Sequence, residues 1–481
     1  MEQKPTLFNY LHDSLVQQIM SGKLVYGEKL PSLRTLCDLY HVGIRTVRDV
    51  MDALVKEGYV ETVQRSYVKV IYRTDEDSVR QARAVLARQD MSLDIMMVLS
   101  YILPPIYAQA CRFCNEEIIR ACRADIRGIE ELSTKDQWRK SRVPFQRIKS
   151  VYHNELLQDL CVDLDLSAQI RILPGFENPY QEMGEDSEQG LNHFYDCIAA
   201  QDYKSVYAII RKMYRIAADI TDGYYSRLNS LYPMEKPRQE TFQWNAQKGR
   251  LRIHMQVTRS IIKKICKGIY PDGTYLPSGT ELCREYKISA YTLGNVTETL
   301  VKMGLVKKMN QRGGYLITCE NACKNESFIS GSTFIQDALT FLEAVHLIAL
   351  ISEGVADLSF VYINEEILEA LCQKVKYKQI RELSASILAT LIQIQPYEPL
   401  REIYRQLENL VDWGCYISFV IHEESVFDII QNKSKTVIAC IRKQDQAAFA
   451  QALKDTYRYV FEAMRDTLID LGVQEADRLR L

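Results

Sequence analysis

Three short blocks near the N-terminus place arginine and hydroxyl side chains at fixed spacing. They are Leu30-Pro31-Ser32-Leu33-Arg34, Val42-Gly43-Ile44-Arg45-Thr46-Val47-Arg48 and Glu57-Gly58-Tyr59-Val60. A guanidinium group can hydrogen-bond guanine or a phosphate. The hydroxyl of Ser32 can accept a bond from a free backbone N–H at the start of a helix. These residue types indicate binding chemistry, and no glycine-rich phosphate loop occurs in the chain.

Parts of these blocks recur far downstream. Leu276-Pro277-Ser278 repeats part of the first block, Met303-Gly304-Leu305-Val306 matches the third, and Thr292 pairs with Thr46. Each pair is separated by 246 positions, so the segment between the blocks has one length in both copies. Cys197-Ile198 and Asp202 recur 243 positions later as Cys440-Ile441 and Asp445. This self-similarity predicts that the whole half-chain is duplicated.

Periodicity around the blocks predicts the elements that position them. Apolar residues at helical spacing predict helices within Leu11 to Met20, Leu33 to Leu39 and Val47 to Leu54. Alternating residues predict strands at Tyr59 to Val63 and Tyr67 to Ile71. The second copy predicts helices at Ile253 to Ile265, Ser278 to Tyr286 and Ser289 to Met303, with strands at Leu305 to Lys308 and Tyr315 to Thr318. Three helices followed by a hairpin make a winged helix-turn-helix.

The segment Gly27 to Val60 resembles the DNA-binding domain of GntR-type bacterial repressors. That family's signature runs L-P-S-x-R-x-L, then V-S-R-x-T-V-R, then E-G-L/Y-V, and the three blocks follow it. The resemblance implies that the third helix enters the major groove of a double-stranded operator. It assigns Arg34 and Thr46 to phosphates and Arg45 and Arg48 to the groove.

The first copy departs from the family pattern at two places. The family's Ser-Arg pair is Gly43-Ile44 here, and its glycine-rich wing is Gln64-Arg65-Ser66. Arg65 is therefore the candidate DNA contact of this wing. Ser32 is expected to cap a helix and not to bind DNA. Base preference should differ from the family's common half-site.

The second copy lacks two of the family's contact arginines, because Thr280 matches Arg34 and Gly294 matches Arg48. Its candidate DNA contacts are Ser289, Tyr291, Thr292, Arg312 and Gly313. Residues 246–320 contain 13 Lys and Arg and 5 Asp and Glu, whereas residues 1–74 contain 10 and 8. Affinity for phosphates rises with such an excess, which favours a DNA-binding role, although a solvated basic face stays an alternative.

A chain of 481 residues is too long to fold around a single hydrophobic core, so its length predicts several domains. We expect a mainly α fold in which two winged helix-turn-helix domains alternate with two all-helical sensor domains. The predicted boundaries are 1–74, 75–243, 244–320 and 321–481. With 60 Lys and Arg against 62 Asp and Glu, DNA affinity must come from local patches.

The two helical segments resemble the FadR-type sensors found behind GntR heads. Many such sensors bind a metal through one Asp and three His. Here Lys149 stands where the Asp would precede His153, Met213 and Thr456 stand in the place of the last His, and His193 is two residues out of register. We expect no metal and no other cofactor. The 29 tyrosines leave open a pocket for a small polar or acidic effector, whose residues the sequence does not locate.

Other features exclude several classes of protein. Ile95 to Ile106 is too short to span a bilayer, and charged residues interrupt Phe334 to Ile363, so both are expected as core helices. The N-terminus does not have the pattern of a secretory signal, and the 13 scattered cysteines favour reduced thiols, so we expect a cytoplasmic protein. The lone pair Cys111 and Cys114 is expected to pack in a helix, because structural zinc needs four ligands.

The prediction is a sequence-specific transcriptional regulator that binds a DNA operator and a small-molecule effector. We expect no enzyme and no membrane partner. The chain would act as an internal pseudo-dimer or as a homodimer. The alternative is a scaffold protein in which one or both winged helices contact proteins instead of DNA.

Overall fold

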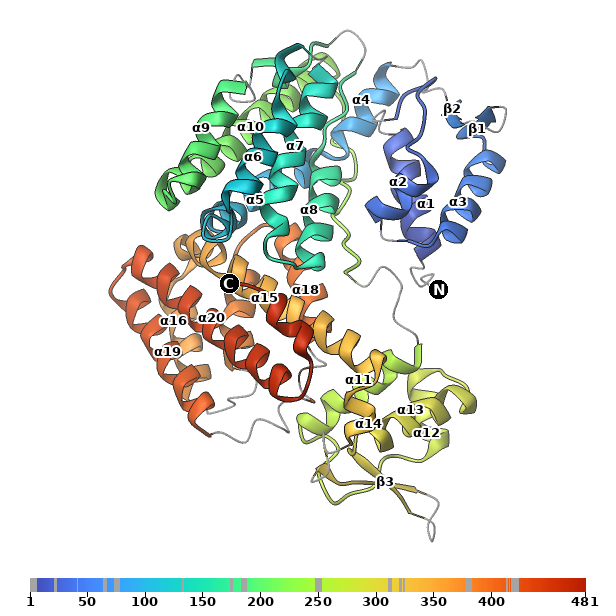
Figure 1. Cartoon of the computed structure of the whole chain (residues 1–481), viewed down its shortest axis with the longest axis vertical. Helices are drawn as coiled ribbons and strands as arrows, with labels where there is room; N and C mark the ends of the chain where they lie inside the picture. The colour runs from blue at the N-terminus through green and yellow to red at the C-terminus, as the bar shows by residue number, and fades with distance from the viewer. Residues whose placement is uncertain are drawn as a thin grey trace.

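The structure is a computed structural model of the chain (Figure 1). It describes residues 7–20, 24–40, 42–63, 67–72, 78–131, 134–173, 176–182, 188–246, 253–309, 314–319, 322, 325–376, 383–411, 414, 416 and 424–481.

The first half of the chain consists of a small head followed by a helical bundle. The first head contains α1 (Leu7–Met20), α2 (Leu33–Tyr40), α3 (Ile44–Lys56), β1 (Val60–Val63) and β2 (Tyr67–Val70). The first bundle contains α4 (Ser78–Leu86), α5 (Gln89–Ala110), α6 (Glu116–Ile126), η1 (Ile129–Glu131), α7 (Thr134–Ser150), α8 (Glu155–Ala168), η2 (Pro179–Glu182), α9 (Glu188–Ala199) and α10 (Tyr203–Leu231).

The second half presents a similar order of elements. The second head contains α11 (Ile253–Cys266), α12 (Gly279–Tyr286), α13 (Ala290–Lys302), β3 (Val306–Met309) and β4 (Gly314–Ile317). The second bundle contains α14 (Glu326–Ile329), α15 (Ser332–Ser359), η5 (Phe360–Tyr362), α16 (Glu365–Lys376), α17 (Leu383–Ile394), α18 (Glu398–Val411), α19 (Glu424–Arg442), α20 (Gln446–Asp470) and η8 (Gln474–Arg478). The predicted mainly α class is confirmed, as are the helices and hairpins expected around the repeated blocks.

Each head closes with a two-stranded antiparallel hairpin. Val60 lies opposite Val70 in the first hairpin, and Val306 lies opposite Ile317 in the second. These inward-facing residues are buried, while the residues that follow them on β1 and β3 are exposed. The alternation arises because successive side chains of a strand point to opposite faces.

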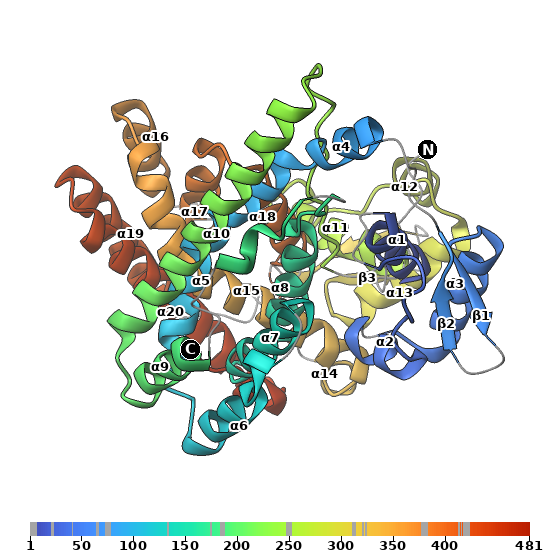
Figure 2. The same ribbon diagram turned by 90° about the horizontal axis from the view of Figure 1, so that it is seen from above.

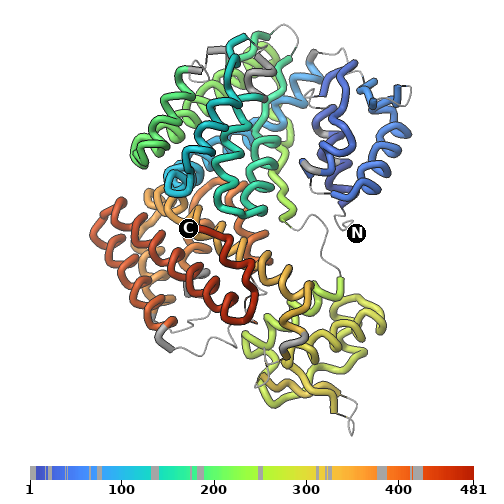
Figure 3. The backbone as a smooth tube through the Cα atoms, viewed as in Figure 1, coloured from blue at the N-terminus to red at the C-terminus, as the bar shows by residue number. Residues whose placement is uncertain are grey.

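The two bundles are stacked and both heads lie on one side of them (Figures 1 and 2). In the first bundle α5 packs most extensively against α10, and in the second α15 packs against α20. The tube in Figure 3 shows the blue and green bundle above the orange and red one. The central helices α5 and α15 also pack against each other, so they join the two halves of the chain.

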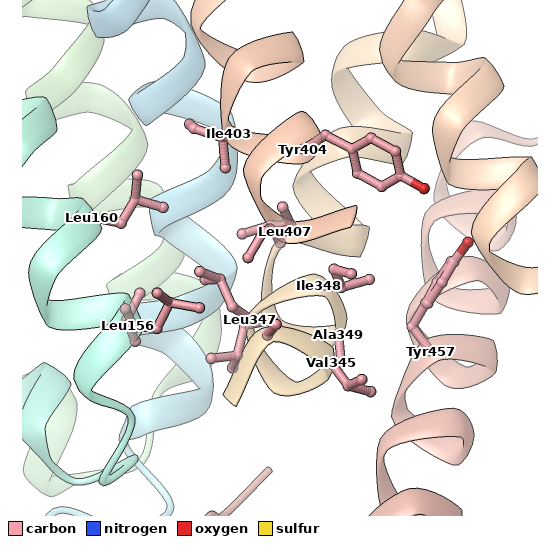
Figure 4. Packing of buried hydrophobic residues seen from close by; sticks show 14 of the residues in the cluster. Leu156, Leu160, Val345, Leu347, Ile348, Ala349, Ile403, Tyr404, Leu407 and Tyr457 are labelled. Atoms are coloured by element: carbon pink, nitrogen blue, oxygen red, sulfur yellow. The ribbon is translucent and has the colours of Figure 1, made fainter. Parts of the chain in front are cut away.

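Buried side chains of both bundles and of the second head form one continuous apolar cluster. Figure 4 shows part of it, where Leu156 and Leu160 of α8 lie near Leu347 of α15. Tyr404 of α18 and Tyr457 of α20 turn toward each other on the other side of α15 (Figure 4). The first head has a separate core around Leu15, Val47 and their neighbours. The second head is therefore packed into the body of the protein more continuously than the first.

The backbones of α5 and α15 come into direct contact where they cross. A Cβ atom added to Gly354 of α15 would lie 2.2 Å from the carbonyl oxygen of Tyr101 on α5. Only glycine fits such an approach without a shift of the helices. Beside the crossing, Arg211 of α10 donates to Asp357 of α15 at 2.6 Å. Gln446 of α20 contacts the same carboxylate.

A second junction between the halves lies at the start of α8. Asn154 is fully buried, and its side-chain oxygen caps α8 by accepting from Leu157 N at 2.8 Å. Its amide nitrogen donates to the carbonyl oxygen of Glu343 at 2.9 Å and lies 3.1 Å from His346 Nδ1. His346 stacks on Phe461 with ring centroids 4.6 Å apart. Burial lowers the pKa of His346 to about 3, so the imidazole is neutral in the folded protein.

Replacing His346 with glutamine is expected to weaken the acid sensitivity of the protein. Between about pH 6.5 and 3 the unfolded chain takes up a proton on His346 that the folded chain does not, so folding free energy is lost as the pH falls. Uptake of at most one proton by His346 changes the free energy of unfolding by at most about 1.4 kcal/mol per pH unit. Urea unfolding at several pH values from 7.5 to 4 measures it.

The nearby Glu343 titrates with the opposite sign, because burial raises its pKa to about 7. The quantity to compare is the change of the unfolding free energy with pH in the wild type and in His346→Gln. Glu343 is present in both proteins, so its contribution cancels in the difference. His193→Gln, at an exposed histidine of α9, supplies the control for the substitution itself. Equal acid sensitivity of His346→Gln and the wild type would show that this histidine does not carry the linkage.

Two stretches of the described chain are long and apolar enough to cross a membrane by length and composition. They are Val79–Ala110 and Ser332–Tyr362. Within them, 72% and 61% of the most apolar window is buried inside the protein. They contain α5 and α15, which form the core of the two bundles as the sequence predicted.

Candidate nucleic-acid interface

The first head presents α3 as an amphipathic helix. Val47, Val50, Met51 and Leu54 are buried at helical spacing against α1 and α2. The opposite face is exposed and includes Arg45 and Arg48, which lie three residues apart and therefore share one side of the helix. These two exposed side chains are accessible to a partner.

The other candidate contacts of the first head surround the start of α3. Arg34 is exposed in the first turn of α2, and Thr46 is partly buried in the first turn of α3. Ser32 Oγ accepts from Thr35 N at 3.1 Å, so Ser32 caps α2 as predicted. Gly43 precedes α3 in an extended conformation and supplies no side-chain cap. Arg65 lies outside the residues that the structure describes.

In the second head, the start of α13 is held by a hydroxyl pair. Ser289 Oγ accepts from Thr292 N at 3.1 Å and lies 3.0 Å from Thr292 Oγ1. The exposed Ser289 therefore also acts as a helix cap, which the sequence analysis did not anticipate. Tyr291 is 81% exposed and projects from the first turn of α13. The structure does not describe Arg312 or Gly313.

Further cations of the second head were missed by the sequence analysis. Exposed examples are Arg284, Lys287, Lys307 and Lys308. At the positions 246 residues earlier, the first head has Asp38 in place of Arg284 and Glu61 in place of Lys307. Comparison of equivalent positions would have found these charge reversals. Lys307 and Lys308 give β3 two exposed positive charges, whereas Arg284 stands on α12 together with the exposed Glu281 and Glu285.

The two heads are attached to their bundles by different polar contacts. Tyr10 of α1 donates to Asp163 Oδ1 of α8 at 2.8 Å. Burial, followed by the charge of Asp163, raises the pKa of Tyr10 well above its usual range. In the second head, the buried Arg259 of α11 pairs with Asp337 of α15 at 3.0 Å. Both contacts reach helices that also meet the other half of the chain.

The residues considered for a metal site do not form a cluster of metal ligands among the described residues. His153 and His193 are both exposed, and Thr456 Oγ1 donates to Ala452 O at 2.8 Å. No group of three or more potential ligands occurs within the described parts of the chain. Lys149 is buried, which lowers its pKa, but its interactions with Cys161 and Asp165 raise that pKa overall, so the amine is cationic.

We expect tag-free protein to contain no stoichiometric zinc or nickel. The buried cation at Lys149 repels a metal ion at the position where the resemblance places a carboxylate ligand. Elemental analysis after dialysis against metal-free buffer measures the content. About one equivalent of a transition metal per chain would contradict this expectation.

Comparison with known proteins identifies the first head. Residues 9–70 match the family described as "Bacterial regulatory proteins, gntR family". The search of curated proteins found no match. Solved structures with similarity include "Streptococcus agalactiae GntR", with 16% identity, a TM-score of 0.21, and coverage of 44% of this chain and 99% of that one.

Two further structures are similar at the same level. One is "E. coli McbR/YncC", with 10% identity, a TM-score of 0.24, and coverage of 45% of this chain and 98% of that one. The other is described by the words "Lar controls the expression of the Listeria monocytogenes agr system and mediates virulence", with 15% identity, a TM-score of 0.21, and coverage of 46% and 98%. Residues 9–70 are thus a gntR-family domain, and this match supports a DNA-binding transcription regulator.

Proposed function

We propose that the chain is a sequence-specific transcription regulator, active in the cytoplasm, whose two heads bind two unlike half-sites of one DNA operator. The observation that carries this proposal is the exposed pair Arg45 and Arg48 on α3 of a gntR-family domain. In this proposal Arg45 and Arg48 contact bases in the major groove, and Arg34 and Thr46 contact phosphates. Arg65 is proposed as a further DNA contact of this head.

An internal duplication would place a second DNA-binding head in the same chain. Its support is the position of the elements, because α11, α12 and α13 each begin and end 246 residues after α1, α2 and α3. The bundles follow the same order, and Asp202 and Asp445 cap α10 and α20 in the same way. We therefore keep the four predicted domains 1–74, 75–243, 244–320 and 321–481, with the helical ones as FadR-like sensors of a small-molecule effector.

We propose that the second head binds DNA more weakly than the first and prefers a different base sequence. Tyr291 and Thr292 stand on the first turn of α13, and Arg312 and Gly313 are proposed as further DNA contacts. Lys307 and Lys308 on β3 add exposed positive charge to this head. Ser289 orders the start of the helix through its bond with Thr292. Tethering raises the effective concentration of this head to about the millimolar range, which allows a weak reader to contribute.

The arrangement of the heads supports an internal pseudo-dimer. Both heads lie on the same side of the stacked bundles in the two perpendicular views (Figures 1 and 2). One chain could thus present two recognition helices to one duplex. Because the exposed residues of α3 and α13 differ, the preferred operator should be an asymmetric pair of half-sites.

Selection of duplexes from a random pool, together with the mass of the selected complex, tests this proposal. One chain on an asymmetric site is the expected result. A symmetric site that holds two chains would favour the homodimer and exclude the pseudo-dimer. Affinity for duplex DNA that does not weaken as salt is raised would favour a protein-binding scaffold, because counterion release requires strong salt dependence.

The effector can be sought independently of DNA. A thermal-shift screen of sugars, organic acids and nucleotides detects ligands of the folded chain, since a ligand at a hundred times its Kd adds about 2.7 kcal/mol of stability. Ligands found in this way are then added to the operator complex, where an effector must change the DNA affinity.

Introducing arginine at Gly294 is expected to strengthen DNA binding by the second head. Gly294 is exposed on α13 at the position equivalent to Arg48, and an added Cβ would have no heavy atom within 4 Å. A new phosphate contact should steepen the salt dependence of affinity by about one unit. Fluorescence anisotropy with a labelled random duplex at several salt concentrations measures the change.

The matched control is Gly294→Ala, which improves helix propensity by about 1 kcal/mol without adding charge. Only Gly294→Arg should change the salt slope. If both variants bind DNA as the wild type does, then α13 does not face DNA.

A further inference from the structure

A groove between α16 and α19 of the second bundle has a volume of about 540 Å³. It is lined by Cys372, Val375, Gln431, Lys435, Ile438, Ala439, Arg442 and Lys443. Lys435, Arg442 and Lys443 are exposed, so the groove is open to solvent along one wall. A volume of this size falls in the range of small-molecule sites.

The first bundle offers an internal reference for this groove, because α6 and α9 stand where α16 and α19 stand in the second. Asn115, Glu116, Glu117 and Ile118 begin α6, and Asn364, Glu365, Glu366 and Ile367 begin α16 in the same order. Both asparagines cap their helix by accepting from the isoleucine N–H, at 3.0 and 2.9 Å. The equivalence therefore assigns Cys372 to the position of Arg123.

In the first bundle, Arg123 links the two helices. It donates to Asn192 Oδ1 at 3.0 Å and to Asp196 Oδ1 at 2.6 Å. At the equivalent positions the second bundle has Cys372, Lys435 and Ala439. The link is thus absent from the second bundle, and the positions that carried it line the groove.

The charges at equivalent positions of α9 and α19 also differ. The acidic Glu188 and Asp196 of α9 correspond to the neutral Gln431 and Ala439 of α19. The neutral Asn192, Ala199 and Ala200 correspond to Lys435, Arg442 and Lys443. Among the residues that the structure describes, three cations and no acidic residue therefore line the groove. Positive charges that line one groove attract an anion, so an anion in the groove would be stabilised.

The remaining wall is apolar. Val375 and Ile438 are buried, and Cys372 is buried with its sulfur 3.2 Å from an Arg442 guanidinium nitrogen. The Arg442 contact holds the guanidinium beside this apolar surface. A ligand that fits both walls has an anionic head for the cations and an apolar body for the side chains of α16 and α19.

The groove lies far from the surface proposed to bind DNA. In both perpendicular views α16 and α19 are on the opposite side of the molecule from the two heads (Figures 1 and 2). Its positive charge is therefore not explained by a duplex bound across the heads.

We infer that the groove between α16 and α19 is a binding site for a small amphipathic anion, either a carboxylate or a phosphate monoester with an apolar body. Arg442, Lys435 and Lys443 hold the anionic group, and Val375, Ile438 and Cys372 contact the apolar body. The inference concerns ligand binding alone and does not require that the chain binds DNA.

Isothermal titration calorimetry on the full chain without DNA tests the site with four probes. Octanoate and octyl phosphate distinguish the two anionic groups, and at least one of them should bind. Octan-1-ol has the same apolar body without charge, and inorganic phosphate has the charge without the body. Both should bind at least about tenfold more weakly, because octan-1-ol lacks the anionic group and inorganic phosphate lacks the apolar body. Octan-1-ol binding as tightly as both anions would overturn the inference.

Variants then locate the binding. Lys435→Ala combined with Arg442→Ala should weaken the binding of the preferred probe about tenfold or more. Cys372→Arg combined with Ala439→Asp introduces the equivalent of the Arg123–Asp196 pair of the first bundle and should abolish binding. Lys374→Ala is the matched control, because Lys374 lies on α16 but donates to Thr390 of α17 at 2.7 Å. Circular dichroism and the unfolding midpoint confirm that each variant is folded.

Wild-type affinity in the Lys435 and Arg442 double variant would overturn the inference. Displacement of the probe by a short DNA duplex would also overturn it, because the groove would then belong to the DNA surface. Failure of the chain to bind any DNA would contradict the proposed function and leave these titrations unaffected.

Discussion

Replacing Gly354 with alanine is expected to destabilise the junction of the two bundles by about 3 kcal/mol or more. The new methyl group would lie 2.2 Å from the carbonyl oxygen of Tyr101, and the obstacle is backbone, which cannot rotate away. The helices α5 and α15 would have to separate, and the packing around Arg211 and Asp357 would be lost with them. Urea unfolding and the binding of the selected operator measure the effect.

The control for this substitution is Gly223→Ala. Gly223 lies in the exposed middle of α10, and an added Cβ would meet nothing within 4 Å. Helix propensity alone should make that variant more stable by about 0.5–1 kcal/mol. The two changes are chemically identical and have opposite expected signs. Equal stability of both variants would contradict the close crossing of α5 and α15.

Replacing Arg48 with alanine is expected to reduce binding of the selected operator by about 1–3 kcal/mol, or about tenfold to more than a hundredfold. The guanidinium is exposed on the face of α3 opposite the buried Val47 and Val50, so its loss leaves the core of the head intact. Discrimination between operator variants should fall together with affinity if Arg48 contacts a base. Titrations with the operator and with single-base variants distinguish a base contact from a phosphate contact.

Lys56→Ala is the matched control for Arg48→Ala. Lys56 is exposed at the other end of α3, so its removal deletes one positive charge from the same helix without touching the start of that helix. We expect only a small, sequence-independent loss of affinity. Unchanged operator affinity of the Arg48 variant would remove Arg48 from the recognition surface, and the assignment of α3 would then depend on Arg45 alone.

Local patterns in the sequence predicted the heads well. The spacing of Val47, Val50, Met51 and Leu54 identified the buried face of α3, and the structure buries all four. The alternation after Gly58 identified the hairpin of β1 and β2. Helices and hairpins of this kind are determined by contacts between residues close in the chain, so their periodicity is visible without a structure. The roles of Arg34, Arg45, Thr46 and Arg48 on DNA remain predictions.

The junction between the bundles could not be predicted in the same way. Gly354 stands alone in an apolar helical segment, a pattern that indicates a special packing position but not its partner. Tyr101 lies in the other half of the chain, and no local pattern relates the two residues. The same holds for Asn154 and His346, and for the loss of the Arg123 link in the second bundle. Such contacts depend on how distant helices are stacked.

Because α5 and α15 belong to one polypeptide, their association does not change on dilution. Separate subunits dissociate as their concentration falls, and the amount of assembled dimer then depends on the square of the subunit concentration. Here the two bundles stay packed together even when a cell holds a single copy of the protein. For the internal pseudo-dimer proposed above, occupancy of an operator should therefore rise in simple proportion to copy number, and two daughter cells that inherit unequal numbers would differ less in their response than with a dissociating dimer.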